Sequence, residues 1–564
     1  MLYLLSRYLN KLRHSCSLII IDCRKGDCVL YKRDVSDDNI LNLNEYIEKL
    51  KENEVGVDFV PAPSLQEKSE NIEIAFVSYD SREIVENSLF ICKGNNFKVE
   101  YLEQAKAKGA VAYLADKDYG VDLPLIKVDN LRRSIAVCVS TYFSNPEKKL
   151  NFIGVTGTKG KSTTVSLIFE MLKAQAEAEG KVKPGLISSL GNFDGLNHFD
   201  SNLTTPEPME MFYLLYCAVK NNVKNMVIEV SSQALKYDRV YGMHFEIGVF
   251  TNIAPDHISD VEHPNFEDYL QSKLKLLERS DIAVLNESSD YLDEQREVAR
   301  NAQEIFEIAT ELNENIKINA SNFEVYIKDI ELEQIGMDFT AVLKNSNREF
   351  RLNTKLEGIF NLENIAQALV VAELMNVDES SIKKGLAIVQ MRDRTIDVKS
   401  ENDNVIFHID AAHNGISFEA VFDHINHKYP DYKKVAVFGT VGNKAENRRE
   451  GMALACNGRI DEIYITRDDN DFESLGNIFD EIVVHLDPDL PVTRIDERTE
   501  AIQTAYNNAM KLWENKGIKS CIILLGKGSD KYMKIDGVKL PYEGDEFYAR
   551  KAIDNYLEDI NEKA

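Results

Sequence analysis

The sequence predicts an α/β protein whose central domain holds a phosphate-binding loop on a parallel sheet, and two observations support this fold class. The first is a strand, a glycine-rich turn and a helix in succession between Phe152 and Leu172. The second is the alternation of apolar, strand-like runs with helical segments, which is typical of parallel sheets covered by helices. Because 564 residues exceed one hydrophobic core, we expect several domains.

The N-terminal part of the chain is predicted to contain two regions. Residues 1–70 are expected to form an atypical extension, with short strands near 18–22 and 27–31 and a polar helix near 40–53. Residues 71–148 are expected to form a small α/β domain, because strand-like runs alternate there with helices.

The rest of the chain predicts two larger α/β domains. The central one, residues 149–391, is expected to bind ligands at the carboxyl ends of its parallel strands. Its strands are expected at 152–155, 226–230, 247–251 and 282–285, with antiparallel strands over 323–352 and a helix over 361–374. Residues 392–564 predict a Rossmann-like domain. Its strands are expected at 405–409, 434–438, 462–466 and 521–525.

Composition and charge argue against several classes of function. A formal net charge of −27 disfavours nonspecific binding to nucleic acid or anionic membranes. The 8 cysteines have no paired CxxC spacing, which disfavours a zinc site and a disulfide-rich secreted domain. Charges at Arg7, Lys11 and Arg13 interrupt the first apolar run, unlike a signal peptide. We therefore expect a cytoplasmic monomer without a membrane span, acting on small molecules.

The glycine turn, Gly154–Thr164, predicts the use of ATP. Glycines let backbone N–H groups surround phosphate oxygens, and the helix that follows adds positive potential at its N-terminus. Lys161 is expected to reach the outer phosphates and Ser162 to bind Mg²⁺. The usual pattern has glycine where this chain has Val155, so the spacing is a variant. The residues expected to bind ATP are Gly157, Thr158, Lys159, Gly160, Lys161, Ser162 and Thr163.

Two polar groups follow other strands of the same predicted sheet. Glu229 lies at the end of one strand, and Asp256 and His257 come shortly after the next. A carboxylate and a neutral imidazole can together hold a divalent cation near substrate oxygens. Each group alone is better explained as a strand-end cap or a surface residue. Their common position beside the loop is what favours a metal site.

A series of motifs resembles the Mur ligase family along roughly residues 72–550. They are Thr156–Ser162, Leu203–Pro206, Glu229–Ser232, Asp256–His257, Tyr269–Lys273, Gly358–Asn364 and Asp410–His413. The resemblance implies a three-domain Mur ligase architecture. It is strongest to the branch that adds the third residue of the peptidoglycan stem peptide, and the runs Asp80–Arg82 and Gly526–Tyr532 support that branch.

The resemblance implies an ATP-dependent ligase. ATP would phosphorylate a carboxylate of a UDP-muramoyl dipeptide, and the amino group of an incoming amino acid would displace the phosphate from the acyl phosphate. Lys161 and Mg²⁺ would offset the charge of the transferring group. Ser162 and Glu229 would hold the first Mg²⁺, and His257 would help to hold a second.

Lys273 matches the family lysine that is carbamylated by CO₂. A carbamate converts a cation into a carboxylate-like ligand, which a site with two cations favours. Read alone, Lys273 would be an ordinary helix lysine near Glu267 or Glu278. The register of Tyr269–Lys273 with the family motif favours the carbamate.

Further ATP contacts are implied in the later part of the chain, and the match is less complete there. The resemblance assigns them to Asn361, Asn364, Arg394, Asp410 and His413. The branch usually reads Asp-Tyr-Ala-His where this chain reads Asp-Ala-Ala-His, and Gln233 replaces a common histidine. These departures weaken the assignment to the branch more than the assignment to ATP-driven ligation.

The two remaining substrates are assigned to separate sets of residues. The UDP-substrate contacts are expected at Ser81, Asn95, Thr204, Thr205, Ser231 and Arg239. Arg239 could pair with a carboxylate or phosphate, although a surface salt bridge is the commoner fate of an arginine. The acceptor contacts are expected at Arg449, Asp469, Asp471, Gly526 and Asp530.

The acceptor residues favour a basic amino acid. Branch members that use meso-diaminopimelate have an arginine for the distal carboxylate, and Asp471 stands at that position here. An aspartate would repel a carboxylate and attract an ammonium group, so we expect L-lysine or ornithine. Two alternatives stay open: a related amide ligase with a folate or another peptide as substrate, and a catalytically silent binding protein of the same fold.

Overall fold

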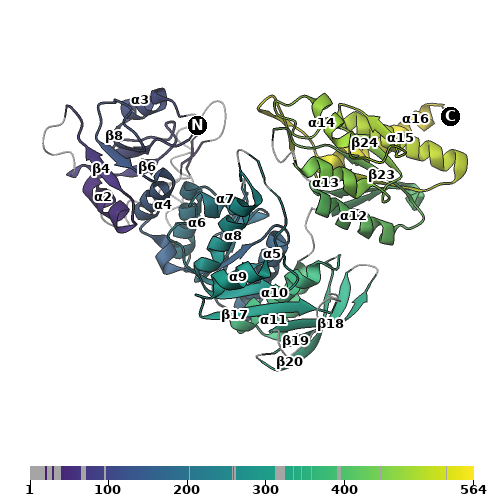
Figure 1. Cartoon of the computed structure of the whole chain (residues 1–564), viewed down its shortest axis with the longest axis horizontal. Coiled ribbons are helices and arrows are strands. Elements are labelled where there is room, and N and C mark those ends of the chain that lie inside the picture. The colour runs from purple at the N-terminus through teal and green to yellow at the C-terminus, as the bar shows by residue number, and fades with distance from the viewer. Residues whose placement is uncertain are drawn as a thin grey trace, which may run out of the picture. The chain divides into compact units, whose positions relative to one another are not determined.

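The computed structural model describes most of the chain (Figure 1). The described residues are 19–21, 28–30, 40–64, 71–94, 97–201, 203–256, 258–259, 262–311, 324–333, 336–344, 346–356, 358–389, 395–443, 447–528 and 530–563. They fall into two compact units. The first draws on Met1–Ile253, Leu270–Thr354 and Phe360–Ile388, and the second on Ala254–Tyr269, Lys355–Ile359 and Val389–Ala564.

The first unit begins with an α/β domain on a five-stranded sheet in the order β4-β9-β8-β7-β6. Strands β6 to β9 are parallel, and β4 pairs antiparallel with β9. The strands are β4 (Val57–Val60), β6 (Phe76–Ser78), β7 (Ser88–Ile91), β8 (Ala110–Ala115) and β9 (Leu125–Val128). The helices are α2 (Leu43–Glu52), α3 (Val99–Ala107) and α4 (Leu131–Tyr142).

This domain starts earlier in the chain than the predicted boundary at residue 71. Helix α2 buries Leu43 and Leu50 on one face, and a capping box between Asn42 and Glu45 fixes its start. Strand β4 then completes the sheet. Part of the predicted extension is therefore domain core, while the two expected short strands form the antiparallel pair β1 (Ile19–Ile21) and β2 (Cys28–Leu30).

One hydrophobic core joins this domain to the central one, which is why two predicted domains form one unit. Helix α4 packs against α6 (Pro208–Lys220) through a chain of aromatic rings. The ring centroids of Tyr142 and Phe143 are 4.8 Å apart, and those of Phe143 lie 6.0 Å from Tyr213 and 5.7 Å from Tyr216. Large aromatic surfaces of this kind supply much of the burial at such a contact.

The central domain is built on an eleven-stranded sheet in the order β13-β12-β11-β14-β10-β15-β16-β17-β18-β19-β20. The strands are β10 (Asn151–Thr156), β11 (Gly185–Ser188), β12 (Gly191–Phe193), β13 (His198–Phe199), β14 (Asn225–Glu229), β15 (Phe245–Phe250), β16 (Ser280–Asn286), β17 (Glu304–Thr310), β18 (Val325–Leu332), β19 (Met337–Leu343) and β20 (Arg348–Thr354). Strands β11 and β14 to β18 run parallel with β10, whereas β19 and β20 extend the sheet antiparallel, as the alternating pattern predicts.

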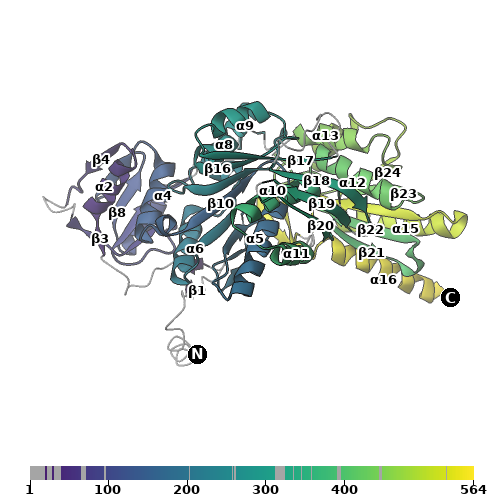
Figure 2. The ribbon, with the colours of Figure 1, turned by 90° about the horizontal axis from the view of Figure 1, so that it is seen from below.

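Register aligns the carboxyl ends of the three strands that matter for the site. In β10, Val155 is opposite Glu229 of β14, and Thr156 is opposite Phe250 of β15. Helices α8 (Phe266–Glu278) and α9 (Leu292–Ala299) lie on one face of the sheet, and α5 (Lys161–Glu179), α10 (Asn361–Leu374) and α11 (Glu379–Ile388) lie on the other (Figure 2). Both faces are thus covered, as the apolar parallel strands require.

The second unit holds the predicted Rossmann-like domain, with a six-stranded sheet in the order β21-β22-β26-β23-β24-β25. The strands are β21 (Thr395–Lys399), β22 (Val405–Asp410), β23 (Lys433–Phe438), β24 (Glu462–Ile465), β25 (Val492–Arg494) and β26 (Ser520–Leu525). All but β21 are parallel. The helices are α12 (Gly415–Lys428), α13 (Asn447–Cys456), α14 (Leu475–Val483), α15 (Arg498–Lys516) and α16 (Asp545–Lys563).

Strand β26 shows why this sheet needs helices on both faces. Cys521, Ile523 and Leu525 pack into one core with α12 to α14. Ile522 and Leu524 alternate with them and pack into a second core with α15 and α16. A hairpin of β27 (Tyr532–Ile535) and β28 (Val538–Pro541) follows the strand.

Candidate active site

The glycine loop between β10 and α5 accepts only glycine at two positions. Gly157 has φ 144°, and a Cβ there would lie 1.9 Å from Thr251 Oγ1. Gly160 has φ 81°, and a Cβ there would lie 2.1 Å from Asn364 Oδ1. Both positions combine a left-handed conformation with close packing. The loop backbone is therefore fixed by its neighbours.

Two residues at the end of β15 hold this loop in place, and the sequence analysis assigned neither of them to the site. Thr158 N donates to Asn252 O at 2.9 Å, and Lys159 N donates to Asn252 Oδ1 at 2.9 Å. Thr251 Oγ1 donates to Lys159 O at 2.5 Å. The only signal in the sequence was the position of Thr251 and Asn252 directly after a predicted strand.

Two lysines converge on one carbonyl oxygen of the loop. Lys161 Nζ donates to Gly157 O at 2.9 Å, and Lys273 Nζ of α8 donates to the same oxygen at 2.7 Å. Lys273 is only 1% exposed. Burial strengthens the repulsion between two such ammonium groups.

Glu229 forms the centre of a cluster of oxygen atoms at the carboxyl ends of β14 and β11. Its side chain is buried, and Oε1 accepts from Ser162 Oγ at 2.9 Å. Oε2 accepts from Ser188 Oγ at 2.8 Å and from Ser189 N and Oγ at 3.0 Å each. The sequence analysis missed Ser188 and Ser189 because it did not identify the short strand β11. Carboxylate and hydroxyl oxygens are ligands that suit Mg²⁺, so this donor set fits the metal.

The two predicted asparagines of α10 lie against the start of α5. Asn364 Nδ2 donates to Asn361 Oδ1 at 3.0 Å, and Thr164 Oγ1 donates to Asn364 Oδ1 at 3.3 Å. Thr163 lies on the first turn of the same helix. The structure therefore brings both asparagines to the phosphate loop.

The residues predicted for the UDP-substrate are divided between the two domains of the first unit. Thr205 Oγ1 donates to Glu229 O at 2.8 Å and accepts from Ser231 N at 2.9 Å, so this threonine is bonded to the end of the strand that carries Glu229. Thr204 precedes it, and Arg239 Nη1 donates to Thr205 O at 3.1 Å. In the N-terminal domain, Ser81 Oγ donates to Gln104 Oε1 at 3.3 Å.

The second unit contains the predicted motif Asp410–His413 and also Asp256. Asp410 Oδ1 accepts from Ala412 N at 2.6 Å, and His413 is exposed beside it with Nδ1 2.9 Å from Ala411 O. Asp256 is buried in this unit, where Oδ1 accepts from Arg448 Nε at 2.9 Å and Oδ2 accepts from Asn414 Nδ2 at 3.2 Å. Asp256 is thus bound to residues near the start of α12 and α13.

The predicted acceptor carboxylates are paired with lysines of the chain itself. Lys527 Nζ lies 2.9 Å from Asp469 Oδ1 and 3.3 Å from Asp530 Oδ2. Lys534 Nζ of the β27–β28 hairpin lies 2.6 Å from Asp471 Oδ2. The carboxylates come after β24 and β26, and Gly526 between strand and lysine has φ 103°. Asp530 is the most accessible of the three, with a half-exposed side chain.

Arg449 is engaged differently from its predicted role. Its side chain is 2% exposed, Nη2 lies 2.7 Å from Glu473 Oε2 and Nη1 lies 2.5 Å from Glu481 Oε2. Burial alone would lower the pKa of Arg449, but these two carboxylates raise it. The guanidinium also donates to Thr440 Oγ1 and Val441 O, and its contact with an acceptor stays a prediction.

Three predicted site residues, Asn95, His257 and Arg394, lie outside the described residues.

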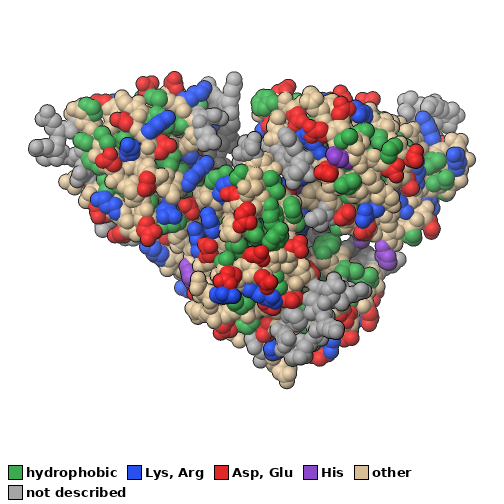
Figure 3. All heavy atoms as spheres, in the orientation of Figure 1, with side chains coloured by type: hydrophobic (Ala, Val, Ile, Leu, Met, Phe, Trp, Pro, Cys, Tyr) green, Lys and Arg blue, Asp and Glu red, His purple; other side chains and the backbone are tan. Residues whose placement is uncertain are grey.

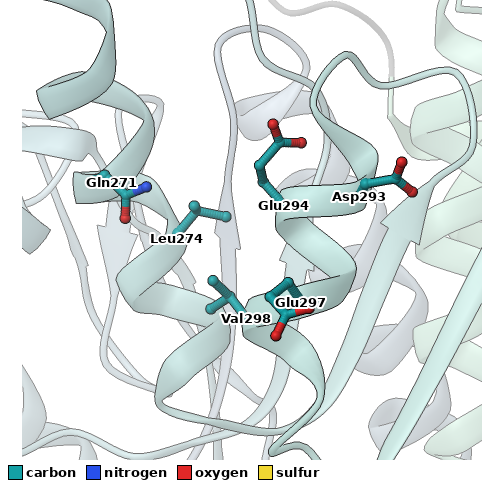
Figure 4. Close-up of a pocket in the computed structure, with 6 residues that line it drawn as sticks. All are labelled: Gln271, Leu274, Asp293, Glu294, Glu297 and Val298. Carbon is teal, nitrogen blue, oxygen red and sulfur yellow. The ribbon is translucent and has the colours of Figure 1, made fainter.

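A pocket of about 360 Å³ between α8 and α9 does not belong to this site (Figure 4). It is lined by Gln271, Leu274, Asp293, Glu294, Glu297 and Val298. Three carboxylates would repel a nucleotide, and Lys273 of α8 is directed to Gly157 instead. On the face seen in Figure 3, acidic and basic side chains are interspersed. In the described part of the chain, no helix has the length and apolar character needed to cross a membrane.

Comparisons with known proteins agree with this geometry. Residues 155–372 match the Mur ligase middle domain, and residues 394–528 match the Mur ligase glutamate ligase domain. The UDP-N-acetylmuramoyl-L-alanyl-D-glutamate--L-lysine ligase of Streptococcus agalactiae is 34% identical over 486 residues, which are 86% of this chain and 93% of that protein.

Solved structures show the same fold. A UDP-N-acetylmuramoyl-L-alanyl-D-glutamate--2,6-diaminopimelate ligase has a TM-score of 0.57 at 22% identity, over 92% of this chain and 100% of that one. A folylpolyglutamate synthase of Mycobacterium tuberculosis, complexed with ADP and AMPPCP, has a TM-score of 0.57 at 15% identity, over 70% of this chain and 92% of that one.

Proposed function

The chain belongs to the Mur ligase family, and from this premise we propose that it adds L-lysine to UDP-N-acetylmuramoyl-L-alanyl-D-glutamate with conversion of ATP to ADP and phosphate. The observation that carries the proposal is the pairing of Glu229 with Ser162 of the phosphate loop, at aligned carboxyl ends of neighbouring strands. The named relative, matched over 93% of its length, supports the choice of substrates.

The chemistry needs positioning and charge neutralisation more than covalent catalysis. The γ-phosphoryl group of ATP passes to a carboxylate oxygen of the D-glutamyl group, and ADP leaves. The amino nitrogen of lysine then attacks the acyl carbon, phosphate leaves with the C–O bond electrons, and the amine loses a proton as the amide forms. Holding the reactants in line accounts for much of the rate in such reactions.

Three residues of the phosphate loop region support the first step. Lys161 would turn from Gly157 O to the outer phosphates, because a phosphate is a stronger partner for an ammonium group than a neutral carbonyl. Ser162 and Glu229 would hold Mg²⁺, which supplies charge neutralisation when bound. Gly157, Thr158, Lys159, Gly160 and Thr163 would surround the phosphates, as the motif predicts.

We extend the proposal to a carbamate on Lys273. The support is its burial and its approach to the same carbonyl oxygen as Lys161. Carbamylation would replace one of two converging cations with an anion that can bind a divalent cation. His257 and Arg394, proposed for a second cation and for ATP, stay predictions, as do the ATP contacts Asn361, Asn364, Asp410 and His413.

The preference for lysine rests on the acidic residues of the second unit. Asp469 and Asp530 pair with Lys527, and Asp471 pairs with Lys534. These pairs support the proposal, because the same carboxylates could bind an ammonium group of the acceptor. Asp530 is the best placed to bind the distal ammonium of the acceptor because it is the most exposed. A monomeric state and a cytoplasmic location also stay predictions.

The test is phosphate release from ATP with UDP-N-acetylmuramoyl-L-alanyl-D-glutamate, measured with L-lysine, L-ornithine, meso-diaminopimelate or no acceptor. Release that requires lysine or ornithine supports the proposal. Release with meso-diaminopimelate alone would keep the ligase and overturn the acceptor assignment. Absence of release with every acceptor would overturn the proposed reaction.

A further inference from the structure

Two cationic side chains from different domains of the first unit share one carboxylate. Lys93 Nζ, which follows β7 of the N-terminal domain, pairs with Glu207 Oε2. Arg239 Nη2 of the central domain lies 2.6 Å from Glu207 Oε1. Lys93 is 18% exposed and Arg239 is 12% exposed, so the cluster is mostly removed from water.

The surroundings of Lys93 are rich in positive charge. Among the described residues, the charged groups that act most strongly on it are Glu207, Arg132 and Arg239. Burial lowers the pKa of Lys93, Glu207 opposes that change, and the two arginines add to it. One carboxylate therefore faces three cations in a protein of net charge −27. Such a local excess favours the binding of a further anion.

Glu207 is placed as a counterion, not as a helix cap. It occupies the N-cap position of α6 and makes no capping hydrogen bond. Its carboxylate is turned to Lys93 and Arg239 instead. Burial alone would raise the pKa of Glu207, but Lys93 and Arg239 lower it, so it stays ionised.

The cluster lies among the residues proposed for the UDP-substrate. Lys93 follows β7 of the N-terminal domain, and its ammonium lies 4.1 Å from the ring centre of Tyr79. Arg239 also donates to Thr205 O, and its Nε is buried without a hydrogen-bond partner in the described part of the chain. The guanidinium of Arg239 therefore contacts Thr205 and Glu207, and its Nε–H can still donate to a ligand.

We propose that Lys93 is a specificity residue for the UDP-substrate, and that Glu207 is an internal carboxylate that an anionic group of this substrate displaces from Lys93 and Arg239. The proposal rests on the proposed function. The shared chemistry of the ligand is an oxyanion, supplied either by the diphosphate or by the carboxylates of the D-glutamyl group.

The test compares Lys93→Gln and Glu207→Gln by calorimetric titration with UDP-N-acetylmuramoyl-L-alanyl-D-glutamate and by steady-state kinetics. Lys93→Gln should raise Kd and KM for this substrate about tenfold or more, with KM for ATP and lysine unchanged. Glu207→Gln should lower Kd several-fold, because it removes the internal competitor. Lys117→Gln is the matched control, since Lys117 also stacks on a tyrosine of the same domain, 5.1 Å from the ring centre of Tyr119.

The two variants have opposite expected signs, which separates displacement from a structural role. If the ion pairs of Glu207 with Lys93 and Arg239 only stabilise the contact between the two domains, both variants will weaken substrate binding and lower the melting temperature. That result would overturn the proposal. Lys93→Arg keeps the charge and should restore most of the affinity. Wild-type protein that releases no phosphate would overturn the proposed function, whereas active wild type with an unchanged Kd in Lys93→Gln would overturn only this inference.

Two further ligands identify the source of the anion. UDP-N-acetylmuramoyl-L-alanine keeps the diphosphate and lacks the D-glutamyl group. Equal loss of affinity for both ligands in Lys93→Gln would assign the oxyanion to the diphosphate. Loss confined to the dipeptide substrate would assign it to a D-glutamyl carboxylate. Both outcomes support the displacement of Glu207.

Discussion

The proposed ATP end of the central sheet and the proposed acceptor end of the C-terminal sheet both lie at the carboxyl ends of parallel strands, yet different interactions stabilise them. At the ATP end, Gly157 and Gly160 leave no room for a side chain, and backbone hydrogen bonds to Asn252 fix the loop. At the acceptor end, Lys527 and Lys534 hold the aspartates through ion pairs.

This difference predicts how each end responds to substitution. In a closely packed loop, an added Cβ atom has no low-energy position, so a single substitution disrupts the loop conformation. The Lys534–Asp471 pair is partly exposed on its lysine side, and exposed ion pairs each contribute only about 0.2–1 kcal/mol and are screened by salt. Single charge changes at the acceptor end should therefore adjust specificity, whereas a side chain added at Gly157 or Gly160 should nearly abolish the reaction.

The largest expected effect tests the steric limit at the ATP end. Gly157→Ala places a Cβ 1.9 Å from Thr251 Oγ1 in a left-handed conformation. We expect kcat/KM to fall at least about a thousandfold, or about 4 kcal/mol, measured by phosphate release. Gly180→Ala is the control, because this glycine ends the same helix at φ 64° with nothing within 4 Å of the added Cβ. Comparable losses of kcat/KM in both variants would show that the cost of a positive φ for alanine, and not a clash within the loop, causes the loss.

The next effect tests whether charge also matters at the ATP end. Lys273→Met removes the ammonium that reaches Gly157 O and any carbamate formed on it. We expect kcat to fall about a hundredfold or more, and wild-type activity to depend on CO₂ in buffers purged of bicarbonate. Intact mass spectrometry under mild conditions would detect the adduct. Full wild-type activity without CO₂ would contradict the carbamate.

The position of the glycine loop could be predicted from the sequence, because its backbone conformation restricts which residue types it accepts. A glycine with positive φ, a lysine and a serine at fixed spacing specify the loop locally, so Gly157, Lys161 and Ser162 could be placed from the sequence. Ser188 and Ser189 could not, because their position depends on which strand neighbours β14 in the sheet. The pairing of distant strands is not encoded in any one segment.

Ion pairs between distant segments are equally hidden from a single sequence. Arg449 was predicted to bind the acceptor, and nothing in its local sequence shows that Glu473 and Glu481 would enclose it. Lys534 lies 63 residues from Asp471 along the chain. The N-terminal boundary was missed for the same reason, since β4 is recognised as a strand only through its pairing with β9.

A smaller effect tests the metal site at the edge of the ATP end. Ser189→Ala removes one hydroxyl from Glu229 but keeps the backbone N–H bond to the same carboxylate oxygen. We expect the Mg²⁺ concentration for half-maximal activity to rise a few-fold, with kcat at saturating Mg²⁺ nearly unchanged. Glu229→Gln should lower kcat itself, because it removes the charge. If both variants changed only the Mg²⁺ requirement, Glu229 would not act on the reacting groups.

The smallest expected effect tests the acceptor end directly. Lys534→Met removes an ammonium 2.6 Å from Asp471, and an acceptor ammonium would no longer compete for that carboxylate. We expect KM for lysine to fall about threefold, in line with the modest energy of a partly exposed ion pair, and KM for ATP to stay constant.

Lys539→Met is the matched control for Lys534→Met, because Lys539 is opposite Lys534 in the β27–β28 hairpin and stacks on Tyr532. If Asp471 faces the acceptor, only Lys534→Met will change KM for lysine, and high salt will reduce the difference from wild type. An unchanged or higher KM in Lys534→Met would assign Asp471 to holding the hairpin and leave Asp530 as the carboxylate that selects lysine. Either result shows whether the charges at this end serve specificity or only structure, which motif spacing alone does not reveal.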